Sequence, residues 1–275
     1  MTVTKKTTCG FIGLGSQGAP MAMRMIEAGY PTVLWARRTA SLENFAETGA
    51  IFAQTIADLA REAEHVGVCV VNDDDVREVC AKLIPVLAPG SRVAIHSTVH
   101  PDTVRQIANE SVEFGVQVID APVSGGEPAA KAGELTVMVG GETGAVAQAR
   151  PIFETFGTLI PYLGEVGAGQ NAKLINNALL AANMAMADHA LGAANALGID
   201  KEAMAELLSA SSGRSFGLEV RARLPELEAF RHGGALLVKD LCLLRAVLPM
   251  DPGVFGLWNG AERLVEAFSG ETSAS

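Results

Sequence analysis

The sequence predicts an α/β protein in two parts: a doubly wound parallel sheet with helices on both faces, followed by a region of helices alone. Short β-rich runs alternate with stretches of helical spacing up to about residue 164, and after Gly169 only the helical period remains. Parallel neighbours need long crossovers, and crossover helices cover both faces of a sheet. We therefore expect one domain over residues 1–164 and a helical domain over residues 165–275.

The strands of the first domain are predicted where β-branched and apolar residues cluster between turns. The five clearest runs are residues 9–14, 32–35, 66–71, 92–96 and 116–119. Residues 21–28 and 104–114 show helical spacing between them. Residues 134–139 and 158–162 are predicted to extend the same sheet, with a helix over residues 144–156 between them.

The second domain is predicted to contain long helices and little else. The expected helices are residues 170–197, 201–210, 235–248 and 254–268. The first would run for about 28 residues, or roughly 42 Å, and an alanine-rich stripe suits it to close helix packing. So long an apolar helix predicts a homodimer, with a tetramer left open.

Composition and charge exclude several classes of protein. The 275 residues are 49% hydrophobic and 19% charged, which argues against disorder, and a net charge of −10 opposes binding to nucleic acid or anionic lipid. The four cysteines form no CxxC pair, so no metal is expected. No secretory signal pattern and no charge-free apolar stretch of about 18 residues is evident, so we expect a cytoplasmic protein that does not bind membranes.

A glycine-rich turn between the first predicted strand and helix has the context of the dinucleotide-binding fingerprint, which predicts a Rossmann-type domain. The turn consists of Gly13, Leu14, Gly15, Ser16, Gln17 and Gly18. Gly13 allows the tight turn, Gly15 lets the backbone approach a pyrophosphate, and Gly18 permits close helix–strand packing. We predict that these six residues bind the phosphates of the cofactor at the helix N-terminus. The alternative is a purely structural turn.

The end of the second predicted strand indicates which dinucleotide binds. NAD-selective sites place an Asp or Glu there to bind the ribose 2′-hydroxyl, but residues 34–39 read L-W-A-R-R-T and contain no carboxylate. The guanidinium groups of Arg37 and Arg38 would instead suit a 2′-phosphate. We therefore predict NADP (NADPH) rather than NAD, the alternative being that these arginines are only solvated.

Four blocks of sequence, taken together, resemble a known family. They are residues 10–22 (G-F-I-G-L-G-S-Q-G-A-P-M-A), residues 120–126 (D-A-P-V-S-G-G) continuing to 139–141 (V-G-G), residues 167–177 (G-A-G-Q-N-A-K-L-I-N-N), and residues 239–241 (K-D-L). In this order they resemble the β-hydroxyacid dehydrogenase family, which includes 3-hydroxyisobutyrate dehydrogenases and tartronate semialdehyde reductases. The resemblance extends from Gly10 to about Leu248. It implies hydride transfer between a nicotinamide and a hydroxyl-bearing carbon, and dimerisation through the long helix.

Lys173 matches the family's catalytic lysine. Oxidation of an alcohol needs a base for the hydroxyl proton, and the reverse reaction needs an acid for the developing alkoxide. A desolvated pocket beside a cationic nicotinamide favours the neutral amine, which can accept that proton. Taken alone, a lysine early on a helix is most often a solvated charge, and the surrounding block reverses that interpretation.

Further residues are assigned to the substrate. Asn177 lies four residues after Lys173 on the same helical face and matches a substrate-binding position, whereas Asn176 is expected to be structural. Ser124, Gly125 and Gly126 follow a strand and match the family's substrate loop, where backbone N–H groups and a hydroxyl suit a carboxylate. The alternatives are a helix–helix hydrogen bond for Asn177 and a tight turn for the loop.

Other matches concern the cofactor and the active-site network. The resemblance places Thr98 beside the nicotinamide half, the backbone of Val71 and Asn72 near the cofactor, and Lys239 in reach of it. It assigns Asp240 to the network that supports the substrate, with a surface charge pair as the alternative. Residues 72–75 (N-D-D-D) are interpreted as a helix N-cap rather than a metal site. His100, a lone histidine at a helix entry, is expected to be structural rather than a base.

The chain departs from the family in two places. Gln17 replaces a methionine, which a phosphate site built from backbone should tolerate, and only 35 residues follow Asp240. Residues 248–253 (L-P-M-D-P-G) should also break a helix where the family continues one. We expect an altered wall of the substrate pocket that could admit a bulkier acid.

The sequence thus predicts an NADP(H)-dependent oxidoreductase acting on a short β-hydroxy acid or its semialdehyde. An imine reductase on the same scaffold is the first alternative, although Lys173 argues against it. A non-catalytic NADP-binding protein is the second.

Overall fold

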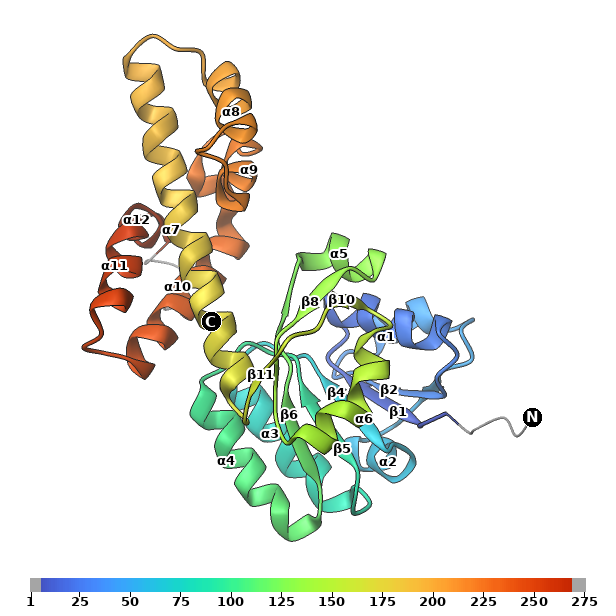
Figure 1. The fold of residues 1–275 in the computed structure, drawn as a ribbon. Helices are drawn as coiled ribbons and strands as arrows, with labels where there is room; N and C mark the ends of the chain where they lie inside the picture. Colours follow the sequence, from blue (N-terminus) through green and yellow to red (C-terminus); the bar gives the residue numbers. More distant parts are fainter. Residues whose placement is uncertain (1–5, 269–275) are drawn as a thin grey trace. The chain divides into compact units, whose positions relative to one another are not determined.

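The computed structural model describes residues 6–268 and divides the chain into two compact units between Lys173 and Leu174 (Figure 1). The first unit is a helix-covered sheet and the second contains helices only, so the predicted fold class is confirmed. The division falls within the long helix α7 (Ala168–Ala196). The domain limits of residues 164 and 165 stay a prediction.

The first unit carries an eight-stranded sheet in the order β11-β9-β6-β5-β4-β1-β2-β3. Its strands are β1 (Cys9–Ile12), β2 (Thr32–Trp35), β3 (Ile51–Phe52), β4 (His65–Val68), β5 (Arg92–Ile95), β6 (Gln117–Asp120), β9 (Val139–Gly140) and β11 (Tyr162–Gly164). Neighbours pair in parallel except β6 with β9. The strand order reverses at β1, so the connections that follow β1 and β4 lead away from each other and leave a crevice at the carboxyl ends of these two strands.

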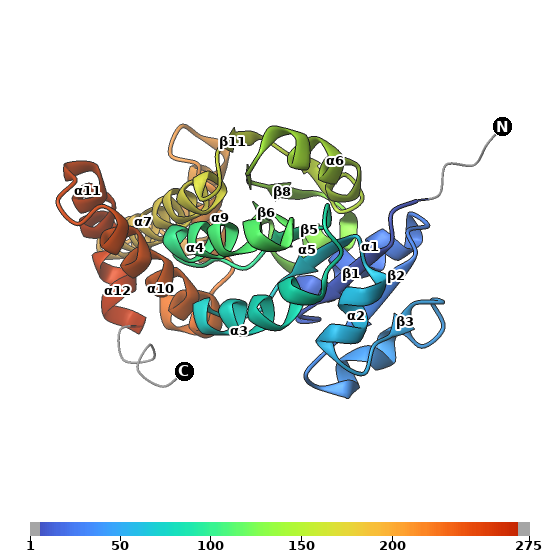
Figure 2. The same ribbon diagram turned by 90° about the horizontal axis from the view of Figure 1, so that it is seen from below.

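Helices cover both faces of this sheet because its central strands are buried on both sides (Figure 2). Phe11 packs in a cluster with α1 (Gly18–Glu27), the 3₁₀ helix η1 (Thr39–Phe45), α5 (Gly126–Ala132) and α6 (Thr143–Phe153). Its neighbour Ile12 points to the other face, toward α2 (Ile56–Glu62), α3 (Asp73–Leu83) and α4 (Pro101–Ser111). The doubly wound arrangement follows from this alternation.

The two segments predicted to extend the sheet are each shared between two sheets, so that prediction was only partly right. β8 (Leu135–Val137) and β10 (Gly157–Leu159) join β7 (Val123–Ser124) in a separate three-stranded sheet, and β9 and β11 continue into the main one. The breaks fall at Met138, whose N–H bonds the carbonyl of Pro122, and at Pro161. Proline has no N–H to donate, so the ladder cannot continue through it.

The second unit is built from α7 and the shorter helices that pack on it. These are α8 (Lys201–Ala210), α9 (Phe216–Ala222), the 3₁₀ helix η4 (Leu227–Phe230), α10 (Arg231–Val247), α11 (Pro252–Gly260) and α12 (Glu262–Phe268). Ala178, Ala181 and Ala185 are buried in a core with Leu241 and Phe268, so small side chains line the packed face of α7. The helix predicted over residues 254–268 is interrupted at Ala261. Within residues 6–268 no helix is long and apolar enough to cross a membrane.

Candidate active site

The glycine-rich turn joins β1 to α1 and uses its three glycines differently. Gly13 has φ +97°, and a Cβ there would overlap the carbonyl oxygen of Cys69. A Cβ on Gly18 would overlap the carbonyl oxygen of Gly13, so these two glycines are required by the chain's own packing. A Cβ on Gly15 would meet nothing within 4 Å. The space above Gly15 is therefore open for a ligand to approach the backbone.

The N-terminus of α1 is left without an internal anion. Gln17 occupies the N-cap without a side-chain capping bond, and the first turn holds no acidic residue. The first N–H groups of a helix have no partner within it and carry a partial positive charge. This turn has the geometry and the electrostatics of a phosphate-binding site.

The two arginines after β2 differ in their surroundings. The guanidinium of Arg37 lies 2.8 Å from the carboxylate of Asp75 and 3.6 Å from that of Glu78. The Arg38 side chain is exposed and makes no ion pair or hydrogen bond within residues 6–268. Arg38 can therefore meet an added phosphate without giving up an existing partner, whereas Nη2 of Arg37 already lies beside two carboxylates.

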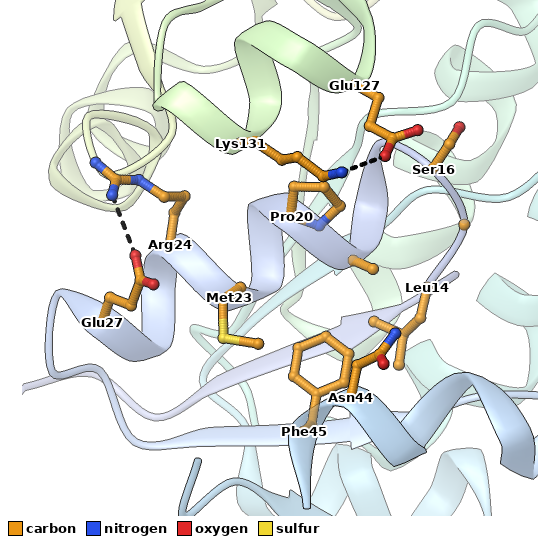
Figure 3. A pocket seen from close by; sticks show the side chains of 12 residues that line it. Leu14, Ser16, Pro20, Met23, Arg24, Glu27, Asn44, Phe45, Glu127 and Lys131 are labelled. Atoms are coloured by element: carbon orange, nitrogen blue, oxygen red, sulfur yellow. Dashed lines mark hydrogen bonds and ion pairs between the residues drawn. The ribbon is translucent and has the colours of Figure 1, made fainter. Parts of the chain in front are cut away.

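A cavity of about 540 Å³ lies beside the glycine-rich turn (Figure 3). Leu14, Gly15 and Ser16 line one side, and α1, η1 and α5 supply the rest. Two ion pairs border it, Arg24 with Glu27 at 3.1 Å and Lys131 with Glu127 at 2.6 Å. Since each cation has its own carboxylate, the rim offers no excess positive charge, and we treat the cavity as space adjoining the phosphate site.

The loops after β4 and β5 contain the residues predicted to lie near the nicotinamide. Val71 is exposed, Thr98 is half-buried, and Asn72 caps α3 by accepting a 2.8 Å hydrogen bond from the N–H of Asp75. The predicted N-cap is confirmed. His100 caps α4 through Nδ1, which accepts from the N–H of Asp102 at 3.1 Å. That bond gives His100 a structural role.

The predicted substrate loop ends β7 and begins α5. Gly125 and Gly126 have φ values of +129° and +70°, conformations that a residue with a side chain rarely adopts. Ser124 is half-buried, and its hydroxyl makes no hydrogen bond among the described residues. The hydroxyl is thus free to bind a ligand, as the sequence predicts for a substrate carboxylate.

Lys173 lies early on α7 and is buried, with only 8% of its surface exposed. The same helix start contacts Asp120, the last residue of β6, which is fully buried. Asp120 accepts hydrogen bonds from the N–H groups of Gly167 and Gln170, each at 2.8 Å. Burial raises the pKa of the Asp120 carboxyl, and the N–H groups of Gly167 and Gln170 oppose that shift.

In the second unit, Asn177 and Asp240 form a buried pair. Nδ2 of Asn177 donates to Oδ2 of Asp240 at 2.6 Å, and Nζ of Lys239 lies 3.1 Å from Oδ1 of the same carboxylate. Asn176 donates through Nδ2 to Oδ1 of Asn177 at 3.1 Å. The helix–helix hydrogen bond considered for Asn177 is therefore present. The amide retains a second N–H and a second lone pair with which to contact a substrate.

Sequence reasoning missed two residues of this arrangement. Asp120 begins the block of residues 120–126 and Gln170 lies in the block of residues 167–177, but neither residue was given a role from the sequence. Asn176 was expected to be structural, and it donates a hydrogen bond to the Asn177 side chain. A useful signal for Asp120 is a carboxylate that ends a buried strand, since a charge at that depth needs donors.

Comparison with known families accounts for both units. Residues 8–164 match the NAD binding domain of 6-phosphogluconate dehydrogenase, and residues 167–268 match the NAD-binding domain of NADP-dependent 3-hydroxyisobutyrate dehydrogenase. The site and these matches define an oxidoreductase of the hydroxyacid dehydrogenase class. The chain belongs to the β-hydroxyacid dehydrogenase family, as the four sequence blocks indicated.

Individual relatives agree with this assignment. The rat mitochondrial 3-hydroxyisobutyrate dehydrogenase is 34% identical over 254 residues, which cover 88% of this chain and 76% of the rat protein. The NAD-dependent L-serine dehydrogenase of Pseudomonas aeruginosa is 37% identical over 220 residues, which cover 76% of this chain and 72% of the Pseudomonas protein. The solved structure of the Mycobacterium tuberculosis 3-hydroxyisobutyrate dehydrogenase with L-serine superposes with a TM-score of 0.84 at 26% identity. The match covers 95% of this chain and 93% of the Mycobacterium chain.

Two further solved structures share this fold. One solved structure that contains NADP⁺ has a TM-score of 0.82 at 27% identity, covering 94% of each chain. A reductive aminase from Aspergillus terreus has a TM-score of 0.68 at 20% identity, and the match covers 95% of this chain and 94% of the aminase chain. At that identity the aminase shows the shared fold alone.

Proposed function

We propose that the protein is an NADP(H)-dependent oxidoreductase that interconverts a short β-hydroxy acid and its semialdehyde. The observation that carries the proposal is a buried lysine, Lys173, early on α7 in a chain that belongs to this family. A buried amine on the helix that also carries Asn177 suits proton transfer to an alcohol oxygen.

Each candidate residue has a role in this reaction. The N–H groups of the loop at Gly125 and Gly126 and the hydroxyl of Ser124 bind the substrate carboxylate. Asn177 orients the reacting oxygen, and Asp240 holds the Asn177 amide through their 2.6 Å hydrogen bond. In the reducing direction the ammonium of Lys173 donates a proton to the carbonyl oxygen. In the oxidising direction the neutral amine removes the hydroxyl proton.

The nicotinamide cofactor would supply or take the hydride, and the chain would hold it in place. The turn from Gly13 to Gly18 (Gly13, Leu14, Gly15, Ser16, Gln17, Gly18) binds the pyrophosphate through the open N-terminus of α1. Val71, Asn72, Thr98 and Lys239 are assigned to the cofactor by the family resemblance.

We infer a preference for NADP over NAD. The support is Arg38, whose exposed guanidinium makes no ion pair within the described residues, together with the absence of a carboxylate in residues 34–39. The relatives named above do not decide the point, because one is an NAD-dependent enzyme and another contains NADP⁺. Arg37 is the secondary contact, since its guanidinium is already paired with Asp75.

We also infer that the protein is a homodimer. Ile175, Leu179 and Met186 are half-exposed at 50%, 51% and 57%, and their spacing places them along one face of α7. A second copy covering this apolar face agrees with the dimer predicted from the helix's length. Leu179→Glu should convert the dimer to a monomer in light scattering, and an unchanged mass would contradict a dimer through α7.

The proposed activity is tested by NADPH and, separately, NADH consumption. The substrates are tartronate, succinic and methylmalonate semialdehydes, a bulky aromatic β-keto acid and a cyclic imine, with Lys173→Ala as the control. We expect NADPH-dependent turnover of at least one semialdehyde and its loss in Lys173→Ala, with cofactor affinity retained.

The same panel distinguishes the two alternatives. Turnover of the imine without turnover of any carboxylate substrate would indicate an imine reductase. Tight NADPH binding without turnover of any substrate would indicate a non-catalytic protein. Activity that survives Lys173→Ala would overturn the assigned mechanism.

A further inference from the structure

The first turn of α7 is anchored by a buried carboxylate from the sheet. Asp120 ends β6, and its two oxygens accept hydrogen bonds from different N–H groups of the helix start: Oδ1 from Gly167 and Oδ2 from Gln170, each at 2.8 Å. The N–H of Gly169 also interacts with this carboxylate. Each oxygen of the Asp120 carboxyl therefore has its own backbone donor at the helix start.

The side chain of Gln170 ties the same turn to two neighbouring strand ends. Its Oε1 accepts from the N–H of Val99 at 3.1 Å, and its Nε2 donates to the carbonyl of Ser97 at 2.8 Å. The hydroxyl of Ser97 in turn accepts from the N–H of Val70 at 2.8 Å. The helix start is thereby joined to the loops that follow β4 and β5.

The surrounding glycines leave room for this anchor. A Cβ on Gly140 would lie 2.6 Å from Oδ1 of Asp120, and a Cβ on Gly169 would lie 2.9 Å from Oδ2. Both Asp120 and Gln170 are fully buried, so their geometry is fixed by packing as well as by hydrogen bonds. The whole connection lies within the first unit.

We propose that Asp120 and Gln170 are positioning residues, which hold Lys173 in register with the loops after β4 and β5. The proposal rests on the proposed function, in which these loops flank the nicotinamide and Lys173 transfers the proton. Gln170 lies three residues before Lys173, so one helical turn connects the two. If the anchor is lost, the amine shifts relative to the loops while the phosphate site on α1 is unaffected.

Such a shift should act on turnover more than on binding. A displacement of about 1 Å between reacting groups can cost on the order of 100-fold in rate. Cofactor affinity should remain nearly constant, because neither Asp120 nor Gln170 belongs to the turn from Gly13 to Gly18. A purely structural role would instead lower thermal stability and the amount of folded enzyme without changing the turnover of each folded site.

The test compares Asp120→Asn and Gln170→Met with a matched control. Asparagine turns an amide NH₂ toward one helix N–H, and methionine keeps the length of glutamine without its polar atoms. The control is Glu142→Gln, which weakens the cap of α6, where Glu142 accepts from Gly144 and Ala145 at 2.8 Å each. That helix carries no candidate catalytic residue, so the control isolates the loss of a cap.

Turnover is measured with the best semialdehyde and expressed per NADPH-binding site titrated by fluorescence. We expect kcat per site to fall by roughly 10- to 100-fold in both variants. The Kd for NADPH should stay within about threefold, and Glu142→Gln should keep the kcat of the unmodified enzyme while its melting temperature falls. If Asp120→Asn does not fold, Gln170→Met alone decides.

Full kcat per site in both variants would overturn the positioning role, as would an equal loss in Glu142→Gln. This outcome differs from failure of the proposed function. If the unmodified enzyme turns over no substrate of the panel, the function is wrong. If it is active, Lys173→Ala is inactive and the Asp120 and Gln170 variants remain fully active, only the positioning role is wrong.

Discussion

The starts of helices α1 and α7 lie in the same unit and follow glycine-containing turns, yet they are built in opposite ways. The start of α1 has no side-chain cap and no acidic residue in its first turn. The start of α7 is closed by the buried carboxylate of Asp120, which accepts hydrogen bonds from Gly167 and Gln170. In both helices the first backbone N–H groups have no partner within the helix itself.

The difference indicates what each start is for. An open N-terminus is a site for an external anion, and the space above Gly15 lets one approach. An N-terminus closed by the chain's own anion offers no such site, but it fixes the helix in place. The first arrangement suits binding of phosphates, and the second suits holding Lys173.

The largest effect should come from closing the open start with a carboxylate. Gly15→Asp has room for its side chain, so the fold should tolerate it, but the carboxylate would repel the pyrophosphate. We expect the Kd for NADPH to rise at least about 100-fold, or roughly 3 kcal/mol, with little change in melting temperature. Fluorescence titration and calorimetry measure the two effects.

Two glycine-to-alanine changes serve as controls for that variant. Gly15→Ala should raise the Kd for NADPH less than Gly15→Asp does, because it adds no charge. Gly18→Ala should lower the melting temperature by several degrees, since its Cβ would overlap the carbonyl oxygen of Gly13. Equal cofactor affinity in Gly15→Asp and the unmodified protein would contradict a phosphate site at α1.

A smaller effect is expected from the arginines beside the open start. Arg38→Ala should raise the Kd for NADPH by roughly 10- to 30-fold, the effect of one charge-assisted hydrogen bond, and that for NADH by less than threefold. Arg37→Ala should have a weaker effect on NADPH, because Arg37 is already paired with Asp75. Equal losses for both cofactors would exclude recognition of the 2′-phosphate.

A separate effect, on folding stability rather than on cofactor binding, concerns two neutral buried groups, His65 and His96. Burial lowers the pKa of His65 to about 3 and that of His96 to about 4. An unfolded histidine titrates near 6.5, so protons bind the unfolded chain first, and stability falls as pH drops from 6.5 toward 4. The loss should be on the order of 1 kcal/mol per pH unit for each histidine.

The loss of stability with acid is tested by measuring the melting temperature between pH 7 and pH 4.5. His65→Phe should lose less stability with acid than the unmodified protein, because it removes one of the two buried groups that take up a proton on unfolding. An unchanged acid dependence in His65→Phe would show that the loss has another origin.

The sequence predicted those parts of the structure that depend on residues close together in the chain. The turn at Gly13, the cap at Asn72 and the ends of α8 are encoded within a few residues, and each was found. The anchor of α7 joins Asp120 to Gly167, which are 47 residues apart, and no local spacing reveals such a pair.

The fold errors have the same cause. The division of residues 134–139 between two sheets depends on a hydrogen bond from Met138 to Pro122, and no pattern within that segment shows it. The break between α11 and α12 occurs beside Gly260, where a Cβ would lie 3.2 Å from that of Ala182 on α7. The division of residues 134–139 between two sheets and the break between α11 and α12 both depend on tertiary contacts. The sequence therefore predicted the helices and strands more reliably than the elements they pack against.

Turnover of a semialdehyde as the NADPH concentration is raised, measured in parallel for Gly15→Asp and Lys173→Met, separates cofactor binding at the open start of α1 from proton transfer by Lys173 on α7. We expect Gly15→Asp to regain much of its turnover at high NADPH, whereas Lys173→Met should stay at least about 1,000-fold slower than the unmodified enzyme at every concentration. Recovery of Lys173→Met at saturating NADPH would contradict proton transfer by Lys173.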